Sequence, residues 1–112
     1  MSIGAGIVRQ VVPAVLTTVY TSPATPGSKT DVRSVTIVNR DENNIGKIWL
    51  YIVPVGDTAG NGNILIPDTK QWEVPKGRNI DYETWKVLGP NDTIQVKGIG
   101  SLTLHIDGAF VV

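Results

Sequence analysis

Residues 93–107, TIQVKGIGSLTLHID, alternate apolar and polar side chains on either side of a glycine-rich break. A repeat of two is the period of a β-strand that buries one face and exposes the other. The apolar members are Ile94, Val96, Leu102, Leu104 and Ile106. The stretch therefore predicts a half-buried hairpin that turns at residues 98–100 and carries polar side chains on one wet face.

Similar strand-like runs recur upstream, separated by turn-forming residues about every ten positions. We expect strands at Val11–Tyr20, Val32–Asn39, Lys47–Val55, Ile64–Ile66, Trp72–Val74 and Ile80–Leu88, and a final apolar run at 109–112 tied into a sheet or an interface. No segment shows an apolar stripe at helical spacing. The predicted fold is all-β: an antiparallel two-sheet β-sandwich, jelly-roll-like, with about seven or eight short strands.

The length of 112 residues fits a single domain. Residues 16–112 are expected to form the sandwich. Residues 1–15 are apolar and glycine-bearing, and two interpretations stay open for them. They form either an arm that lies across a neighbouring subunit or an ordinary first edge strand with a short tail.

Ten basic and ten acidic residues give a formal net charge of zero. Without a broad electrostatic field, neither nucleic acid nor an anionic membrane is an expected partner. No run approaches the roughly 20 apolar residues of a membrane-spanning helix. The chain has no cysteine, which excludes disulfide bonds, thiolate catalysis and cysteine-based zinc sites.

The sequence has few of the residue patterns that catalysis requires. His105 is the only histidine, and the alternation places it on the wet face as an ordinary surface residue. The acidic residues are spread over different turns, and the glycine-rich stretch 56–62 lacks the lysine of a phosphate-binding loop. We therefore expect no enzyme, no catalytic residue, no metal site and no cofactor.

Aromatic side chains carry the one functional signal in the composition. Trp49, Trp72 and Trp85 with Tyr51 and Tyr82 would make a sugar-stacking platform if they were exposed together. The favoured interpretation is that they fill the core or a subunit interface, because large aromatic residues are mostly buried. The candidate interface residues are Ile3, Ile7, Val8, Val11, Val12, Trp49, Tyr51, Trp72 and Trp85.

From Leu16 onward the order of these pieces resembles a family of small β-sandwich virion proteins of tailed bacteriophages. The resemblance rests on the lead-in TTVYTSP at 17–23, a strand that closes on asparagine at 35–39, and IWLYIVP at 48–54. It continues through a glycine-rich loop and a short aliphatic strand to LGPNDTIQV at 88–96 and a last hairpin that ends near Gly108. About four fifths of the chain takes part in it.

The resemblance implies a β-sandwich displayed on a virion, as a capsid decoration or head-fibre-base protein or as a neck or tail accessory subunit. Its partners would be other virion proteins (major capsid, neck or tail proteins) and further copies of itself, after synthesis in the host cytoplasm. The alternative is a carbohydrate-binding module that holds a host surface glycan on exposed tryptophans.

Overall fold

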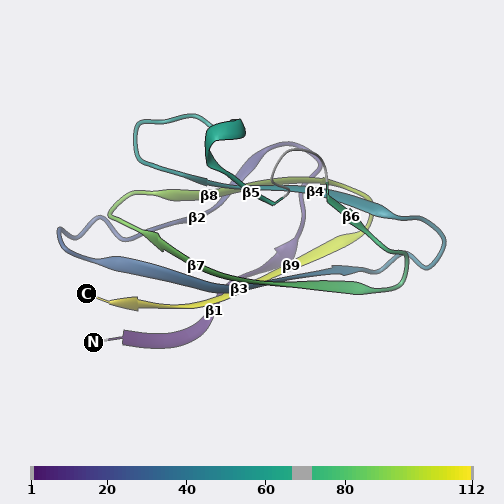
Figure 1. Cartoon of the computed structure of the whole chain (residues 1–112), viewed down its shortest axis with the longest axis horizontal. Coiled ribbons are helices and arrows are strands. Elements are labelled where there is room, and N and C mark those ends of the chain that lie inside the picture. The colour runs from purple at the N-terminus through teal and green to yellow at the C-terminus, as the bar shows by residue number, and fades with distance from the viewer. Residues whose placement is uncertain (1, 67–71, 112) are drawn as a thin grey trace.

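The computed structural model describes residues 2–66 and 72–111, which fold as two packed β-sheets (Figure 1). The strands are β1 (Ser2–Val11), β2 (Thr17–Thr21), β3 (Lys29–Asn39), β4 (Gly46–Val53), β5 (Ile64–Ile66), β6 (Trp72–Val74), β7 (Asn79–Leu88), β8 (Thr93–Ile99) and β9 (Leu102–Val111). A short 3₁₀ turn, Asn61–Asn63, precedes β5. Within the part of the chain that the structure describes, no helix has the length and apolarity to cross a membrane.

The two sheets have a jelly-roll topology. Sheet A is four-stranded in the order β1-β9-β3-β7, and sheet B has the order β2-β8-β4-β5, with β6 also paired to β4. All the pairings are antiparallel, and β5 and β6 share one position beside β4. The predicted all-β sandwich is confirmed, with nine described strands in eight positions.

The core lies between the sheets, because each long strand turns alternate side chains inward. Val35 and Ile37 of β3, like Ile48 and Leu50 of β4, are at most 1% exposed. Each such side chain contributes about 1.5–3 kcal/mol by leaving water. In the described residues no buried side-chain nitrogen or oxygen lacks a hydrogen bond, so the core contains no uncompensated polar group.

The predicted hairpin at 93–107 is wrong in its pairing, although its alternation is right. The inward residues of both strands are fully buried, but β8 belongs to sheet B and β9 to sheet A. The chain crosses between sheets at Gly100, whose φ of 107° suits glycine. The alternation of apolar and polar residues predicts which side chains of a strand point inward. It does not predict which other strand pairs with it.

The predicted strand Val11–Tyr20 is also wrong, because β1 ends at Val11 and β2 begins at Thr17. Residues 12–16 carry the chain from sheet A to sheet B. There the Val12 amide donates to the Leu102 carbonyl (2.9 Å), and the Pro13 carbonyl accepts from the Gly98 amide (2.9 Å). A proline without an amide hydrogen suits this crossing better than the interior of a ladder.

Two buried or half-buried polar side chains hold the loops. Asn39 donates from Nδ2 to the carbonyls of Asn44 (2.9 Å) and Val74 (3.2 Å), and its Oδ1 accepts from the Asp41 amide (2.9 Å). Asp92 accepts from the Val55 amide at Oδ1 (2.9 Å) and from the Gly89 amide at Oδ2 (2.8 Å). These bonds fix one loop at each end of the sandwich.

Candidate functional site

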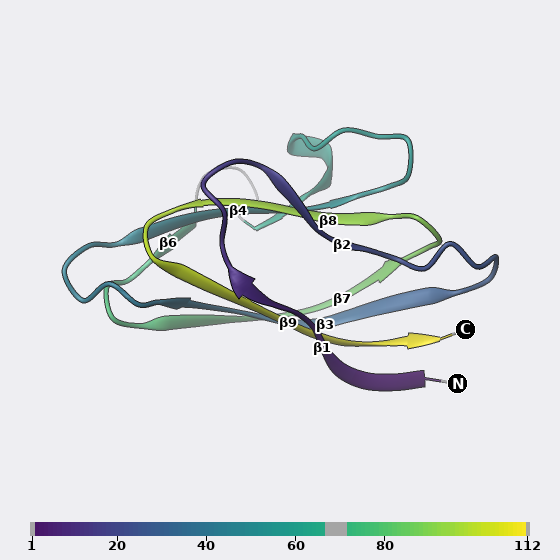
Figure 2. The ribbon, with the colours of Figure 1, turned by 180° about the vertical axis from the view of Figure 1, so that it is seen from behind.

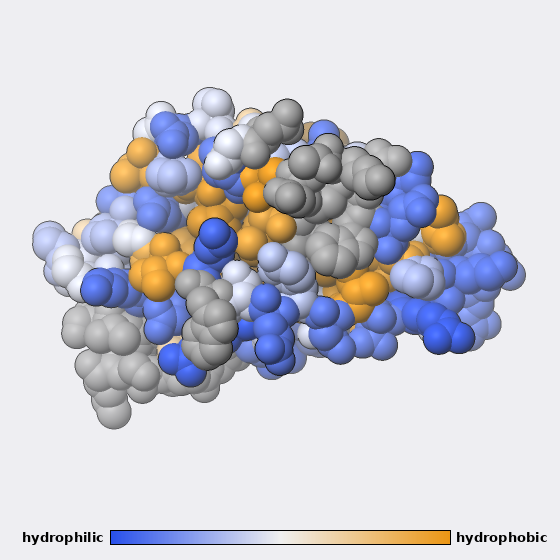
Figure 3. Space-filling view, viewed as in Figure 1, coloured by the Kyte–Doolittle hydropathy of each residue, from blue (hydrophilic) through white to orange (hydrophobic). Residues whose placement is uncertain are grey.

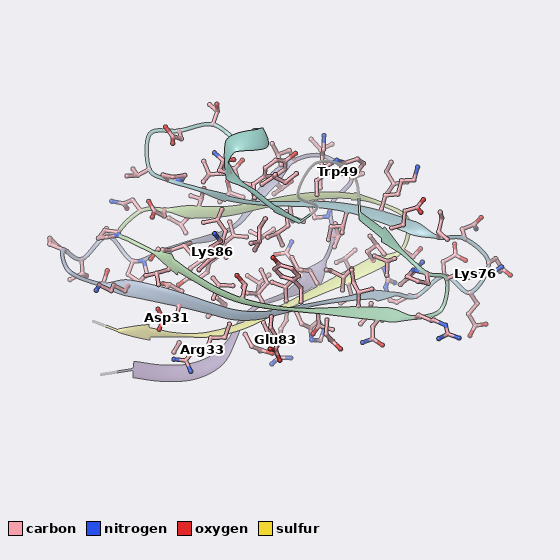
Figure 4. The ribbon with its side chains drawn as sticks, viewed as in Figure 1. Asp31, Arg33, Trp49, Lys76, Glu83 and Lys86 are labelled. Carbon is pink, nitrogen blue, oxygen red and sulfur yellow. The ribbon has the colours of Figure 1, made fainter. Side chains whose placement is uncertain are left out.

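The outer side of sheet B carries an aromatic face, which we define as Trp49, Tyr51, Gln95 and Lys97. The register sets Trp49 opposite Lys97 and Tyr51 opposite Gln95, and all four are half-buried. The Lys97 ammonium lies 5.0 Å from the centre of the Trp49 ring, which is cation–π range. Figure 4 shows Trp49 on the side of sheet B that faces away from sheet A. The face combines flat apolar surface with polar groups, as protein interfaces do.

The other aromatic candidates do not join this face as a set. Tyr82 is on β7 of sheet A and packs against the core. The backbones of Trp72 and Trp85 lie in β6 and β7, which belong to different sheets. The side chains of these two tryptophans lie outside the described part of the structure. Among the aromatic candidates whose side chains the structure describes, Trp49 and Tyr51 share one face of a sheet.

The N-terminal candidates divide between the core and the surface. Val8 and Val12 are 4% and 6% exposed, and Ile7 packs against the same cluster. Val11 is 60% exposed. Ile3 pairs with Phe110 through the backbone, and its side chain lies outside the described part. In the single chain the residues 2–11 thus form an edge strand of sheet A, and of the described N-terminal candidates Val11 is the one that is exposed.

A shallow apolar depression of about 220 Å³ lies between the sheets on the side of β7. Its lining comes from the end of β4, the loop before β5, β5 itself and Lys86 of β7: Ile52, Pro54, Gly62, Asn63, Ile64, Leu65 and Lys86. Figure 3, which views this side, shows apolar surface between the two sheets. The volume is below the roughly 300 Å³ at which small-molecule pockets begin. The depression exposes Leu65 of the core cluster and the partly buried Ile52 that packs against it.

The outer side of sheet A is polar. Arg9 of β1 lies 3.4 Å from the Asp107 carboxylate and 3.3 Å from Nδ1 of His105, both on β9. On the other half of the sheet the Thr36 hydroxyl donates to Asp81 of β7 (2.7 Å). His105 is half-buried on this outer face, which is the face predicted for it. Sequence reasoning did not single out Arg9 or Asp81, because neither belongs to a recognisable motif.

Among the titratable groups, Asp41 has a lowered pKa. Hydrogen bonds from the Asn43 amide and the Asn44 side chain stabilise its carboxylate. These contacts close the turn after β3, so the shift belongs to a structural feature. In the described ranges 2–66 and 72–111, no group of three or more histidine or acidic residues is placed to hold a metal ion.

Comparisons with known proteins identify the fold and no sequence family. No family model and no curated protein matches the sequence. The structure is similar to a chain of the Bacillus endospore appendages, which form disulfide-linked pili, with a TM-score of 0.54 and 10% identity over 100% of this chain and 87% of that one. A chain of infectious bursal disease virus, Gx strain, has a TM-score of 0.48 and 10% identity over 98% of this chain and 30% of that one. The first similarity shows that the β-sandwich is shared.

Proposed function

We propose that this chain is a non-enzymatic structural subunit that self-associates, and that its particle is the virion of a tailed bacteriophage. There it would act as a capsid decoration or head-associated protein, or as a neck or tail accessory subunit. Its partners would be further copies of itself and the major capsid, neck or tail proteins. The phage assignment rests on the sequence resemblance from Leu16 onward.

The observation that carries the structural role is the apolar surface of the single chain. Seven large hydrophobic side chains of the described residues are at least 40% exposed: Val11, Val15, Leu16, Ile45, Val55, Val87 and Ile99. The Ile45 carbonyl lies beside Gly100, so Ile45 and Ile99 both lie where β8 turns into β9, whereas Val11 lies opposite Thr103 on sheet A. Gathered apolar surface of this kind is typical of proteins that bind other proteins.

The shared fold with a pilus subunit supports assembly in general. That protein forms disulfide-linked pili, whereas this chain contains no cysteine. Copies of this chain would therefore be held together by non-covalent contacts. A formal net charge of zero favours such contacts, because little long-range repulsion separates the copies.

The phage assignment is tested on virions. An antibody raised against the purified chain is applied to gradient-purified phage particles from a lysate that produces the protein, and bound gold is located by electron microscopy. We expect label at regular positions on the head, neck or tail. Intact particles without label, in a lysate that contains the soluble chain, would contradict the assignment.

The aromatic face supports a second candidate, a carbohydrate-binding module. Lys97 covers one side of the Trp49 ring, so a sugar would stack on its other side, with Tyr51 and Gln95 beside it. The test is tryptophan fluorescence across a panel of host-surface glycans, with Trp49→Ala as the comparison. A spectrum that no glycan shifts would remove this candidate.

A further inference from the structure

We infer that the sheets of one copy continue into those of a second copy, with β7 of one chain pairing antiparallel with β1 of the next. This rests on the proposed self-association and identifies its surface and its partner. Among the residues that the structure describes, β1 pairs with β9 alone and β7 with β3 alone. Each is a ten-residue strand with one unpaired edge. Long unpaired edges are templates for pairing with another chain.

The directions of the strands permit this continuation by simple repetition. Sheet A has four antiparallel strands, so its two edge strands run in opposite directions. A second copy in the same orientation therefore places its β1 antiparallel to β7 of the first. The order β2-β8-β4-β5 gives sheet B the same property. Figure 1 shows β7 and β5 nearest the viewer, and Figure 2, from behind, shows β1 and β2 nearest. A second copy displaced along the shortest axis of the molecule would therefore continue both sheets.

The register of the ladders sets complementary charges at the two edges. Arg9 is opposite His105, His105 is opposite Thr36, and Thr36 is opposite Asp81. These four residues form one row across the outer face of sheet A, with a cation at one edge and an anion at the other. Continuing the row without a shift sets Arg9 of the second copy opposite Asp81 of the first. Opposite charges at directly facing positions stabilise antiparallel pairs.

The inward-facing rows of sheet A, next to this charged row, would cover exposed apolar side chains in the same contact. One row runs Val8, Ile106, Val35 and Tyr82, so the same displacement sets Val8 of the second copy opposite Tyr82 of the first. Ile80 and Tyr82 are only partly buried in the single chain, as is Ile52 at the depression beside β7. The second copy would cover these side chains and remove apolar surface from water.

The contact is head-to-tail, since β1 of one copy meets β7 of another. Such contacts build a ring if the rotation between copies closes and an open helical filament if it does not. Because β-sheets twist, each added copy is rotated relative to the one before. The assembly is therefore not a simple two-fold dimer.

Charge reversal tests the contact between Arg9 and Asp81. Arg9→Glu and Asp81→Lys each set like charges opposite each other, and each is expected to weaken self-association about tenfold. An equimolar mixture restores both kinds of junction if the two variants alternate along the assembly, so the mixture should assemble where either variant alone does not. The control is Arg33→Glu. Arg33 lies 3.6 Å from Asp31 on the interior strand β3 and, like Arg9, is more than half exposed.

A cysteine pair tests the same geometry without setting like charges opposite each other. The chain has no native cysteine, so Arg9→Cys together with Asp81→Cys introduces the only two thiols. Facing Cα atoms of an antiparallel pair are about 4.5–5.5 Å apart, which suits a disulfide bond. Within one chain the two positions are three strand spacings apart, roughly 14 Å, which is too far. Mild oxidation should therefore give a ladder of covalent oligomers, whereas each single-cysteine variant gives dimers at most.

The outcomes separate this inference from the proposed function. A ladder from the cysteine pair, with rescue in the charge mixture, supports the inference. Wild-type assembly combined with no ladder, or with charge variants that assemble as wild type does, overturns the sheet contact and leaves the structural role standing. A wild-type chain that stays monomeric overturns both. Circular dichroism verifies that every variant retains its β-sheet signal, and a charge variant that fails this check is replaced by the cysteine pair.

Discussion

At Gly108 of β9, the backbone of β3 comes too close to leave room for a side chain. A Cβ atom placed there would collide with the carbonyl oxygen of Asp31 and would lie 3.4 Å from Cα of Val32. The contact falls at the irregularity in the β3–β9 register between Val32 and Ser34. Glycine at such a position marks close approach of two backbones.

Gly108→Ala is therefore expected to lower the free energy of unfolding by about 1–3 kcal/mol, because the two strands must separate. The measurement is urea denaturation followed by tryptophan fluorescence. Gly60→Ala is the control, since a Cβ at Gly60 meets nothing within 4 Å. Equal stability of the two variants would show that β3 and β9 are not this close.

Asn39 is a second residue whose single side chain holds several backbones together. Asn39→Ala removes two donors and one acceptor from a site that is 2% exposed. We expect a loss of about 2–3 kcal/mol in the free energy of unfolding, because buried carbonyls lose their partners. Asn43→Ala, at an exposed side chain in the following turn, should cost far less. A loss as small as that of the control would contradict the hydrogen-bond assignment.

The lowered pKa of Asp41 predicts how the stability of the fold changes with pH. A carboxyl whose pKa is lower in the folded chain stabilises the fold above its ordinary value of 3.8, and this stabilisation is lost as the pH falls through the folded pKa. Asp41→Asn cannot titrate. The melting temperature of the wild type should therefore fall more than that of Asp41→Asn between neutral pH and a pH well below 3.8. Parallel melting curves over this range would contradict the assignment.

At the scale of the elements, alternation predicted the strands and their inward faces, but not their partners. Ile48 and Leu50 face inward as expected, and Trp49 and Tyr51 share the outer face. A period of two cannot show that β8 and β9 lie in different sheets, because that depends on which distant strand pairs with each of them. The same limit kept Arg9 and Asp81 out of the sequence-based candidates, since three ladder registers are needed to relate them.

The composition of the N-terminal residues did not predict whether they form an arm or a strand of the sandwich. An apolar, glycine-bearing stretch left an arm and an edge strand equally open. The structure pairs β1 with β9 and buries Val8 and Val12 in the core. Removing residues 2–10 would thus remove a strand of sheet A, so charge reversal at Arg9 is the sharper probe of assembly.

Asp92 links two elements at the end of the sandwich, where the loop after β4 meets the turn before β8. Asp92→Ala leaves the Val55 and Gly89 amides without this partner and should lower the free energy of unfolding by about 1–3 kcal/mol. Hydrogen exchange at these two amides should accelerate more than exchange in the core strands. Asp57→Ala, at an exposed position in the neighbouring loop, is the control. Unchanged exchange at Val55 would contradict the link.

At the scale of the whole molecule, the chain is a small sandwich with features that self-association would cover. In the described ranges both sheets end in strands that pair on one side, and apolar side chains lie exposed between the sheets and at the end where β8 turns into β9. Assembly into a particle would satisfy the edges and the apolar surface together.

Self-association is tested by the mass of the purified wild-type chain, measured by light scattering over a series of concentrations. We predict that the mass rises with concentration to several times the 12.0 kDa of one chain. A mass that stays at 12.0 kDa at every concentration would show that the chain does not self-associate.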